Sequence, residues 1–122
     1  METAVFRCLT LHFYTAINNW DICGMSVYPE ANDYTSIVAQ TKATIEDMQT
    51  LFHKPSMIVE TGFEASNPEA GTYFMQQLSA ATVEAGGLGI FYWEPESYQW
   101  NGYTKGAWNA TTKEPLPFLW SY

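Results

Sequence analysis

Hydrophobic residues recur at a helical spacing in three segments of the chain. In residues 3–18, 36–52 and 72–85, apolar side chains fall one, three or four positions apart and line one side of a helix. Thr35 or Ser36 stands where it can cap the second of these helices. The pattern therefore predicts three amphipathic helices, each with one buried face.

Three short apolar runs separate and follow these helices. They cover residues 20–28, 56–60 and 88–93, and each is too short for another helix but typical of a strand buried in a parallel sheet. The order helix, strand, helix, strand, helix, strand requires crossover connections, which predicts an α/β fold. The spacing of apolar residues alone fits both a closed barrel and an open doubly wound sheet. Residues 96–122 are predicted to form a long loop with a short helix near 117–120.

The composition and net charge of the chain argue against some kinds of binding partner. The chain has 13 Asp and Glu against five Lys and Arg, a formal net charge of −8. An acidic chain repels phosphate backbones, so we expect no nucleic acid partner, and no basic cluster or long apolar run points to a membrane. Aromatic residues make up 16% of the chain. This content fits either a ring-rich core or a cleft in which flat rings stack on sugars.

The cysteines and histidines do not form a metal-ligand pattern. Cys8 is predicted to lie on a helix and Cys23 in a strand, and neither has the spacing of a metal site. His12 and His53 likewise form no ligand set. We interpret both cysteines as structural, leave a disulfide between them open, and expect no metal ion.

Candidate chemistry lies where the predicted strands end. In parallel α/β folds function collects at the carboxyl ends of the strands, and here those ends hold Tyr28, Glu60, Trp93 and Glu94. Each has a structural interpretation: the carboxylate could cap a helix or pair with a lysine, and the two rings could simply pack. Their coincidence at three successive strand ends favours a site. A phenol can hold a carboxylate ionised and an indole can form the floor of a sugar subsite, which suits glycoside hydrolysis.

Three stretches carry a more specific signal. They are WDICGMSVYP at 20–29, MIVETG at 57–62 and GLGIFYWEP at 87–95. The first resembles the D-x-x-G-x-S-x-Y-P signature of glycoside hydrolase family 53, the arabinogalactan endo-β-1,4-galactanases, and the others resemble that family's second and third signatures. They occur in family order and span the greater part of the chain.

This resemblance implies a fold, a reaction and roles for the four residues. The chain would supply strands six to eight, with their helices, of a (β/α)8 barrel. Glu60 matches the catalytic nucleophile, Tyr28 the tyrosine that contacts it, and Trp93 the tryptophan beneath the sugar. Glu94 belongs to the same motif and would bind substrate hydroxyls or support its loop. The implied reaction is hydrolysis of β-1,4-galactosyl bonds in pectic galactan by double displacement, with retention and without a cofactor. The implied location is extracellular or periplasmic.

The sequence also departs from the family. The family's acid/base is the Glu of an Asn-Glu pair, and no such dipeptide occurs here; Glu94 and Glu96 are the candidate neighbours, and neither matches. A retaining mechanism needs two carboxyl groups about 5–5.5 Å apart. We therefore expect residues 1–122 to be the C-terminal part of one barrel domain that lacks its N-terminal half. Such a chain should be a poor catalyst, and its open half-barrel should self-associate.

Two alternatives to a galactanase stay open. One is a non-catalytic carbohydrate-binding or inert fragment. The other is a different retaining glycosidase of the same clan, such as a mannanase.

Overall fold

A parallel sheet with helices on one side forms the body of the molecule. The computed structural model describes residues 19–121, so the predicted helix at 3–18, with Cys8 and His12, lies outside the described residues. Within them, three parallel strands in the order β1-β2-β3 form one sheet, which confirms the α/β class. The elements are β1 (Cys23–Val27), α2 (Tyr34–Phe52), β2 (Ser56–Thr61), α3 (Pro68–Glu84) and β3 (Ile90–Tyr92).

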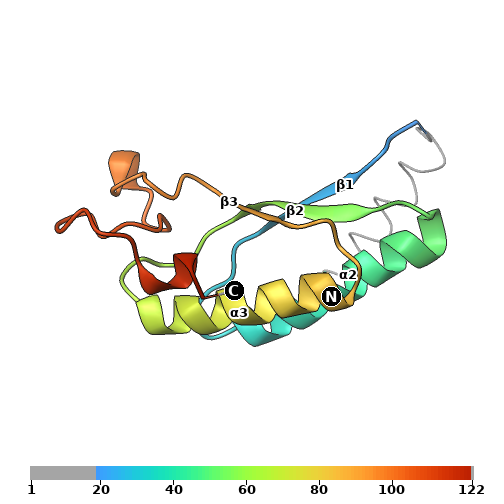
Figure 1. Cartoon of the computed structure of the whole chain (residues 1–122), viewed down its shortest axis with the longest axis horizontal. Helices are drawn as coiled ribbons and strands as arrows, with labels where there is room; N and C mark the ends of the chain where they lie inside the picture. The colour runs from blue at the N-terminus through green and yellow to red at the C-terminus, as the bar shows by residue number, and fades with distance from the viewer. Residues whose placement is uncertain (1–18, 122) are drawn as a thin grey trace.

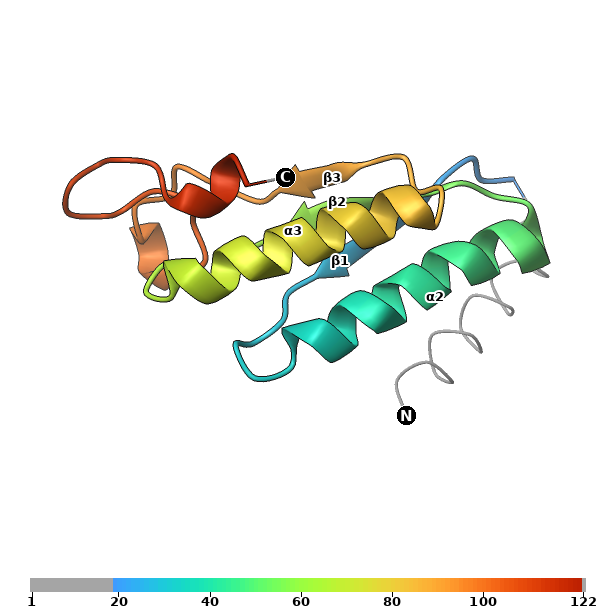
Figure 2. The same ribbon diagram turned by 60° about the horizontal axis from the view of Figure 1, so that its bottom comes forward.

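The two helices form one layer against one face of the sheet (Figures 1 and 2). Side chains on this side fill the core between the layers, and several are fully shielded from solvent. They include Ile45, Ile58, Phe63, Phe74, Leu78 and Phe118. The rings of Phe63 and Phe74 stack with centroids 5.3 Å apart. The apolar stripes predicted for both helices are therefore the faces that pack on the sheet.

Both helices begin earlier than the hydrophobic period predicts. α3 begins at Pro68 rather than at residue 72, because the Asn67 side chain accepts a hydrogen bond from the Ala70 amide and proline suits the first helical position. α2 begins at Tyr34, and Asp33 occupies the N-cap position without a capping bond from its side chain. The prediction that Thr35 or Ser36 caps this helix was wrong, since both lie inside it.

The last strand is shorter than predicted and the long loop is more ordered. β3 covers Ile90–Tyr92 instead of 88–93, although the Trp93 amide still donates to the Thr61 carbonyl at 2.8 Å. The short helix expected near 117–120 is the 3₁₀ helix η2 (Pro117–Leu119). A further 3₁₀ turn, η1 (Trp100–Gly102), was not predicted.

The face of the sheet away from the helices is open in the part of the chain that the structure describes. Ser26 of β1 is exposed, and Val59, Phe91 and Trp93 are exposed to 38%, 61% and 44%. The strands, predicted to be buried in a parallel sheet, are thus covered on only one face by the residues from 19 to 121. The candidate site residues lie on this open face, at the carboxyl end of the strands.

Candidate active site

A β-bulge determines where Glu60 points. Met25 pairs with Ile58, but the next residue of β1, Ser26, pairs with Glu60, so Val59 is an extra residue on β2. Paired residues of neighbouring strands point to the same side of a sheet. Because Ser26 is on the open face, the bulge brings the Glu60 carboxylate to that face, while Thr61 returns to the core and donates to the Val27 carbonyl at 2.8 Å.

Tyr28 follows β1 and reaches the Glu60 carboxylate. Its hydroxyl donates to Oε2 of Glu60 at 3.3 Å, although the two residues are 32 positions apart in the sequence. Burial raises the pKa of Tyr28, and the neighbouring Tyr103 and Glu60 raise it further. The phenol therefore stays protonated and acts as a hydrogen-bond donor to a carboxylate, as the sequence predicted for this pair.

Trp93 and Glu94 lie directly after β3, at the same end of the sheet. The Trp93 ring is partly exposed, and its alternation with Ile90 and Tyr92, which pack against the core, puts it on the open face with Phe91. Glu94 is exposed, adopts a left-handed backbone with φ of 40°, and lines an open hollow with Glu96 and Trp100. The structure records a direct bond to Glu60 from Tyr28 but from neither of these residues.

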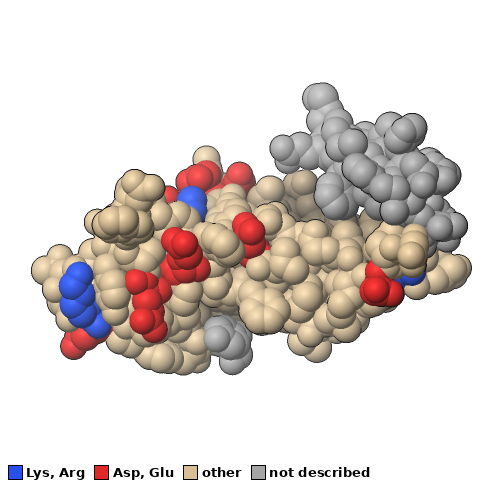
Figure 3. Space-filling model, turned by 90° about the horizontal axis from the view of Figure 1, so that it is seen from above, with Lys and Arg blue, Asp and Glu red and all other residues tan. Residues whose placement is uncertain are grey.

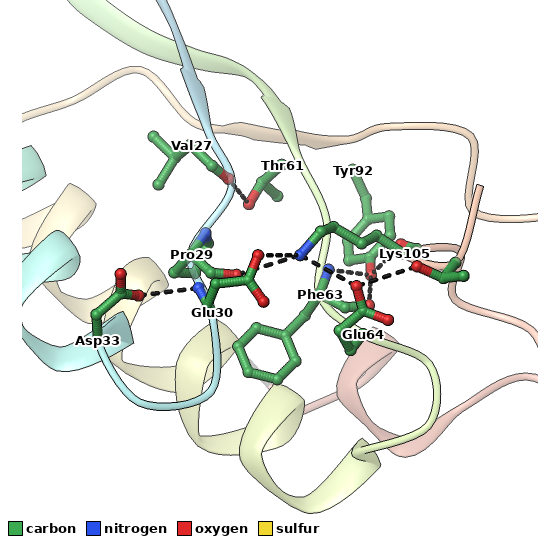
Figure 4. A network of polar contacts seen from close by, with 10 residues as sticks. Val27, Pro29, Glu30, Asp33, Thr61, Phe63, Glu64, Tyr92 and Lys105 are labelled. Atoms are coloured by element: carbon green, nitrogen blue, oxygen red, sulfur yellow. Dashed lines mark hydrogen bonds and ion pairs between the residues drawn. The ribbon is translucent and has the colours of Figure 1, made fainter. Parts of the chain in front are cut away.

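Sequence reasoning missed a cation that connects the strand ends. Lys105 contacts Oε1 of Glu30 at 3.1 Å and Oε1 of Glu64 at 3.2 Å, and it donates to the Pro29 carbonyl at 3.4 Å (Figure 4). Its side chain is only 17% exposed. Glu64 is thereby fixed to the loop after β3. Because the sequence has few Lys and Arg residues, each one is a candidate partner for the many carboxylates. Nothing in the sequence distinguished Lys105 from Lys113 in this respect.

Negatively charged side chains are concentrated at the end of the molecule where the candidate site lies. Seen from the side of the sheet, most of the Asp and Glu side chains in view lie over the half that holds residues 93–121 (Figure 3). Among residues 19–121, no group of three or more His, Cys, Asp or Glu side chains is arranged to hold a metal ion. No helix in that range is long and apolar enough to cross a membrane.

Solved structures of glycosidases share this fold. A fungal β-1,4-galactanase matches 84% of this chain and 37% of its own, with a TM-score of 0.61 and 20% identity. An endo-1,4-β-D-mannanase from Thermotoga petrophila matches 60% of this chain and 22% of its own, with a TM-score of 0.53 and 20% identity. At these identities the comparison establishes only the arrangement of strands and helices, which matches part of each of these larger α/β chains.

Curated proteins of similar sequence indicate a more specific relationship than the solved structures do. An arabinogalactan endo-β-1,4-galactanase of Cellvibrio japonicus is 29% identical over 99 residues, which cover 63% of this chain and 26% of the relative. Arabinogalactan endo-β-1,4-galactanase A of Aspergillus niger is 28% identical over 95 residues, or 63% of this chain and 27% of the relative. No family model matches the chain. The resemblance to the endo-β-1,4-galactanases is thus confirmed, and the chain spans about a quarter of the length of the curated relatives it matches.

Proposed function

We propose that this chain carries the nucleophile side of a retaining endo-β-1,4-galactanase site, with Glu60 as the nucleophile. One observation carries the proposal: a bulge turns a strand-end carboxylate onto the open face of the sheet, where a phenol donates to it at 3.3 Å. A carboxylate held in this way faces the open side of the sheet, as attack on an anomeric carbon requires. The names of the sequence relatives supply the substrate class, β-1,4-linked galactan.

We further propose that the sheet is part of a (β/α)8 barrel, with β1, β2 and β3 as strands six to eight. An open doubly wound sheet carries helices on both faces, whereas a barrel carries them only outside. Here α2 and α3 share one face, and the strands follow their sequence order across the sheet. The open face then corresponds to the inside of the barrel, where Trp93 would floor the sugar subsite.

The remaining roles follow from this assignment. Glu94 would bind substrate hydroxyls from the hollow that it lines with Glu96 and Trp100. The acid/base carboxylate would come from residues other than those of this chain, since the sequence holds no Asn-Glu pair. The protein would act on galactan outside the cytoplasm, in the extracellular space or the periplasm.

An activated substrate analogue tests the nucleophile without its acid/base partner. In 2,4-dinitrophenyl 2-deoxy-2-fluoro-β-galactobioside, the Glu60 carboxylate would attack the anomeric carbon while the bond to the phenolic oxygen breaks. Dinitrophenolate leaves with the electron pair and needs no proton, and the fluorine slows hydrolysis of the glycosyl ester. Intact-protein mass spectrometry should show one added glycosyl unit, located on Glu60 by peptide mapping.

Two variants and a second sugar make the test specific. Glu60→Gln should abolish labelling, while Glu69→Gln, an exposed acid in the first turn of α3, should label like the parent chain. Labelling of another carboxylate, or none at all, would overturn the assignment of Glu60. Faster labelling by the corresponding mannobioside would favour the mannanase alternative. A solved mannanase has a similar arrangement of strands and helices.

A further inference from the structure

The bulge in β2 lies between two residues that are held by backbone hydrogen bonds. The Ile58 amide donates at 3.0 Å to a carbonyl just before β3, and the Thr61 carbonyl accepts from the Trp93 amide at 2.8 Å. Between these two residues the register of β2 shifts against both neighbouring strands. A force applied to this part of the strand therefore displaces Val59 and Glu60 more readily than the residues on either side.

Gly24 of β1 leaves free the space next to the Val59 side chain. Gly24 lies two positions before Ser26 on the same strand, so it belongs to the open face. A Cβ at Gly24 would lie 3.1 Å from Cγ1 of Val59, 3.2 Å from its Cγ2 and 3.8 Å from its Cβ. Two carbon atoms attract best at about 3.5–4.0 Å, so the two methyl groups of Val59 are the atoms that a larger residue would push away.

A push on Val59 would reach the Glu60 carboxylate. Valine is branched at Cβ and stiff at χ1, so a force on its methyl groups is transmitted to its backbone. The next residue is Glu60, whose Oε2 accepts from the Tyr28 hydroxyl at 3.3 Å. Hydroxyl donors usually lie about 2.5–3.0 Å from their acceptors, so this contact is already long and a small displacement would break it.

We propose that Gly24 is a positioning residue: its missing side chain admits the methyl groups of Val59, and the bulge can then direct Glu60 toward Tyr28. This inference rests on the proposed function, because it assigns Gly24 an effect on the reactivity of Glu60. Gly24 acts through Val59 and has no side chain with which to touch the sugar. The glycine of β1 and the bulged residue of β2 form a matched pair.

The labelling reaction measures this effect in the chain as it exists. Gly24→Ala should lower the maximal rate of Glu60 labelling about three- to tenfold, the range expected for loss of one hydrogen bond. In a Val59→Ala background the same substitution should change the rate by less than about twofold, because both crowded methyl groups are gone. Equal rates in Gly24→Ala and the parent, or an equal loss in both backgrounds, would overturn the proposal.

A second glycine provides the matched control. Gly71→Ala also introduces a crowded methyl group, but the group lies against Phe118 on α3. Val59→Ala should therefore not relieve any effect of Gly71→Ala. If Gly24→Ala alone does not fold, the double variant with Val59→Ala must regain both the fold and the labelling rate of Val59→Ala. A double variant that stays unfolded would overturn the proposal.

Carbon NMR follows the carboxylate without the reaction. In a chain carrying ¹³C at the glutamate carboxyl carbons, the Glu60 signal is the one that disappears in Glu60→Gln. Gly24→Ala should shift this signal in the parent chain and leave it in place in the Val59→Ala background. A Glu60 signal that does not respond to Gly24→Ala would overturn the inference even if Glu60 is labelled. Failure of the parent to label would count against the proposed function alone, and the NMR comparison would still decide whether Gly24 positions Glu60.

Discussion

The hydroxyl of Tyr28 donates to Oε2 of Glu60 at 3.3 Å across the parallel pair formed by β1 and β2. The contact joins the residue after one strand to the residue next to the end of the other, so it exists only if the two strands keep their register. The contact therefore ties the direction of the Glu60 carboxylate to the position of the Tyr28 phenol.

We predict that Tyr28→Phe weakens the nucleophile without unfolding the chain. The maximal rate of Glu60 labelling should fall about three- to tenfold, because one hydrogen bond to the carboxylate is lost. Stopped-flow release of dinitrophenolate measures this rate, and far-UV circular dichroism should be unchanged. An unaltered rate would mean that the phenol has no influence on Glu60.

Lys105 should matter more to stability than the surface lysine of α2. Lys105→Met removes a mostly buried cation and leaves Glu64, whose side chain is 30% exposed, without its ion pair, which should cost about 1–2 kcal/mol of unfolding free energy. Lys42→Met removes an exposed pair with Glu84 and should have a smaller effect. Urea unfolding of the two variants compares them directly, and equal costs would contradict the anchoring role of Lys105.

Gly71→Ala should destabilise the chain although alanine favours helices. A Cβ here would lie 2.6 Å from Cδ1 of Phe118 and 3.3 Å from Cδ1 of Phe63, so the rings that seat the C-terminal segment on α3 would have to move. We expect a net loss of about 1–3 kcal/mol, against the roughly 1 kcal/mol that alanine contributes elsewhere in a helix. A gain in the unfolding midpoint would show that Phe118 is not held against α3.

Alkaline pH should destabilise the fold through buried phenols. Burial raises the pKa of Tyr92, whose hydroxyl accepts from the Phe63 amide at 3.0 Å and donates to the Lys105 carbonyl at 2.9 Å. A raised folded pKa means that the contribution is fully present below the unfolded value of 10.0 and is lost as pH rises above it.

Urea unfolding between pH 8 and pH 11 measures this loss. Tyr92→Phe should flatten the decline above pH 10 by up to about 1.4 kcal/mol per pH unit, at a lower starting stability. Tyr73→Phe serves as the control on α3. If the decline is as steep in Tyr92→Phe as in the parent, other groups cause it.

The open face of the sheet should make the chain self-associate. Phe91 is 61% exposed there, beside Val59 and Trp93, and contiguous apolar side chains of this size favour association. Phe91→Thr keeps a strand-forming residue and should lower the apparent mass in sedimentation velocity at high concentration. Leu51→Gln, at the half-exposed end of α2, is the control. A chain that is monomeric before substitution would contradict this prediction.

Local patterns predicted the elements well, and long-range contacts accounted for the differences. The stripe containing Phe74 and Leu78 located α3, but its first turn depends on the Asn67 cap, a polar signal that the hydrophobic period does not contain. Glu60 and Tyr28 could be brought together because both lie at the carboxyl ends of predicted strands. Tyr103 and Lys105 could not, because their partners are fixed by the path of a loop that has no period of its own.

The bulge at Val59 also links the length of β2 to the direction of the Glu60 side chain. In regular register at the present length, Val59 would lie opposite Ser26, and Glu60 would lie opposite Val27, whose side chain is buried against the helices. The carboxylate would then enter the core, where an unpaired charge is strongly unfavourable. Deletion of Val59 would instead remove the bulge and leave Glu60 opposite Ser26, so the open face can keep the carboxylate in a shorter, regular strand.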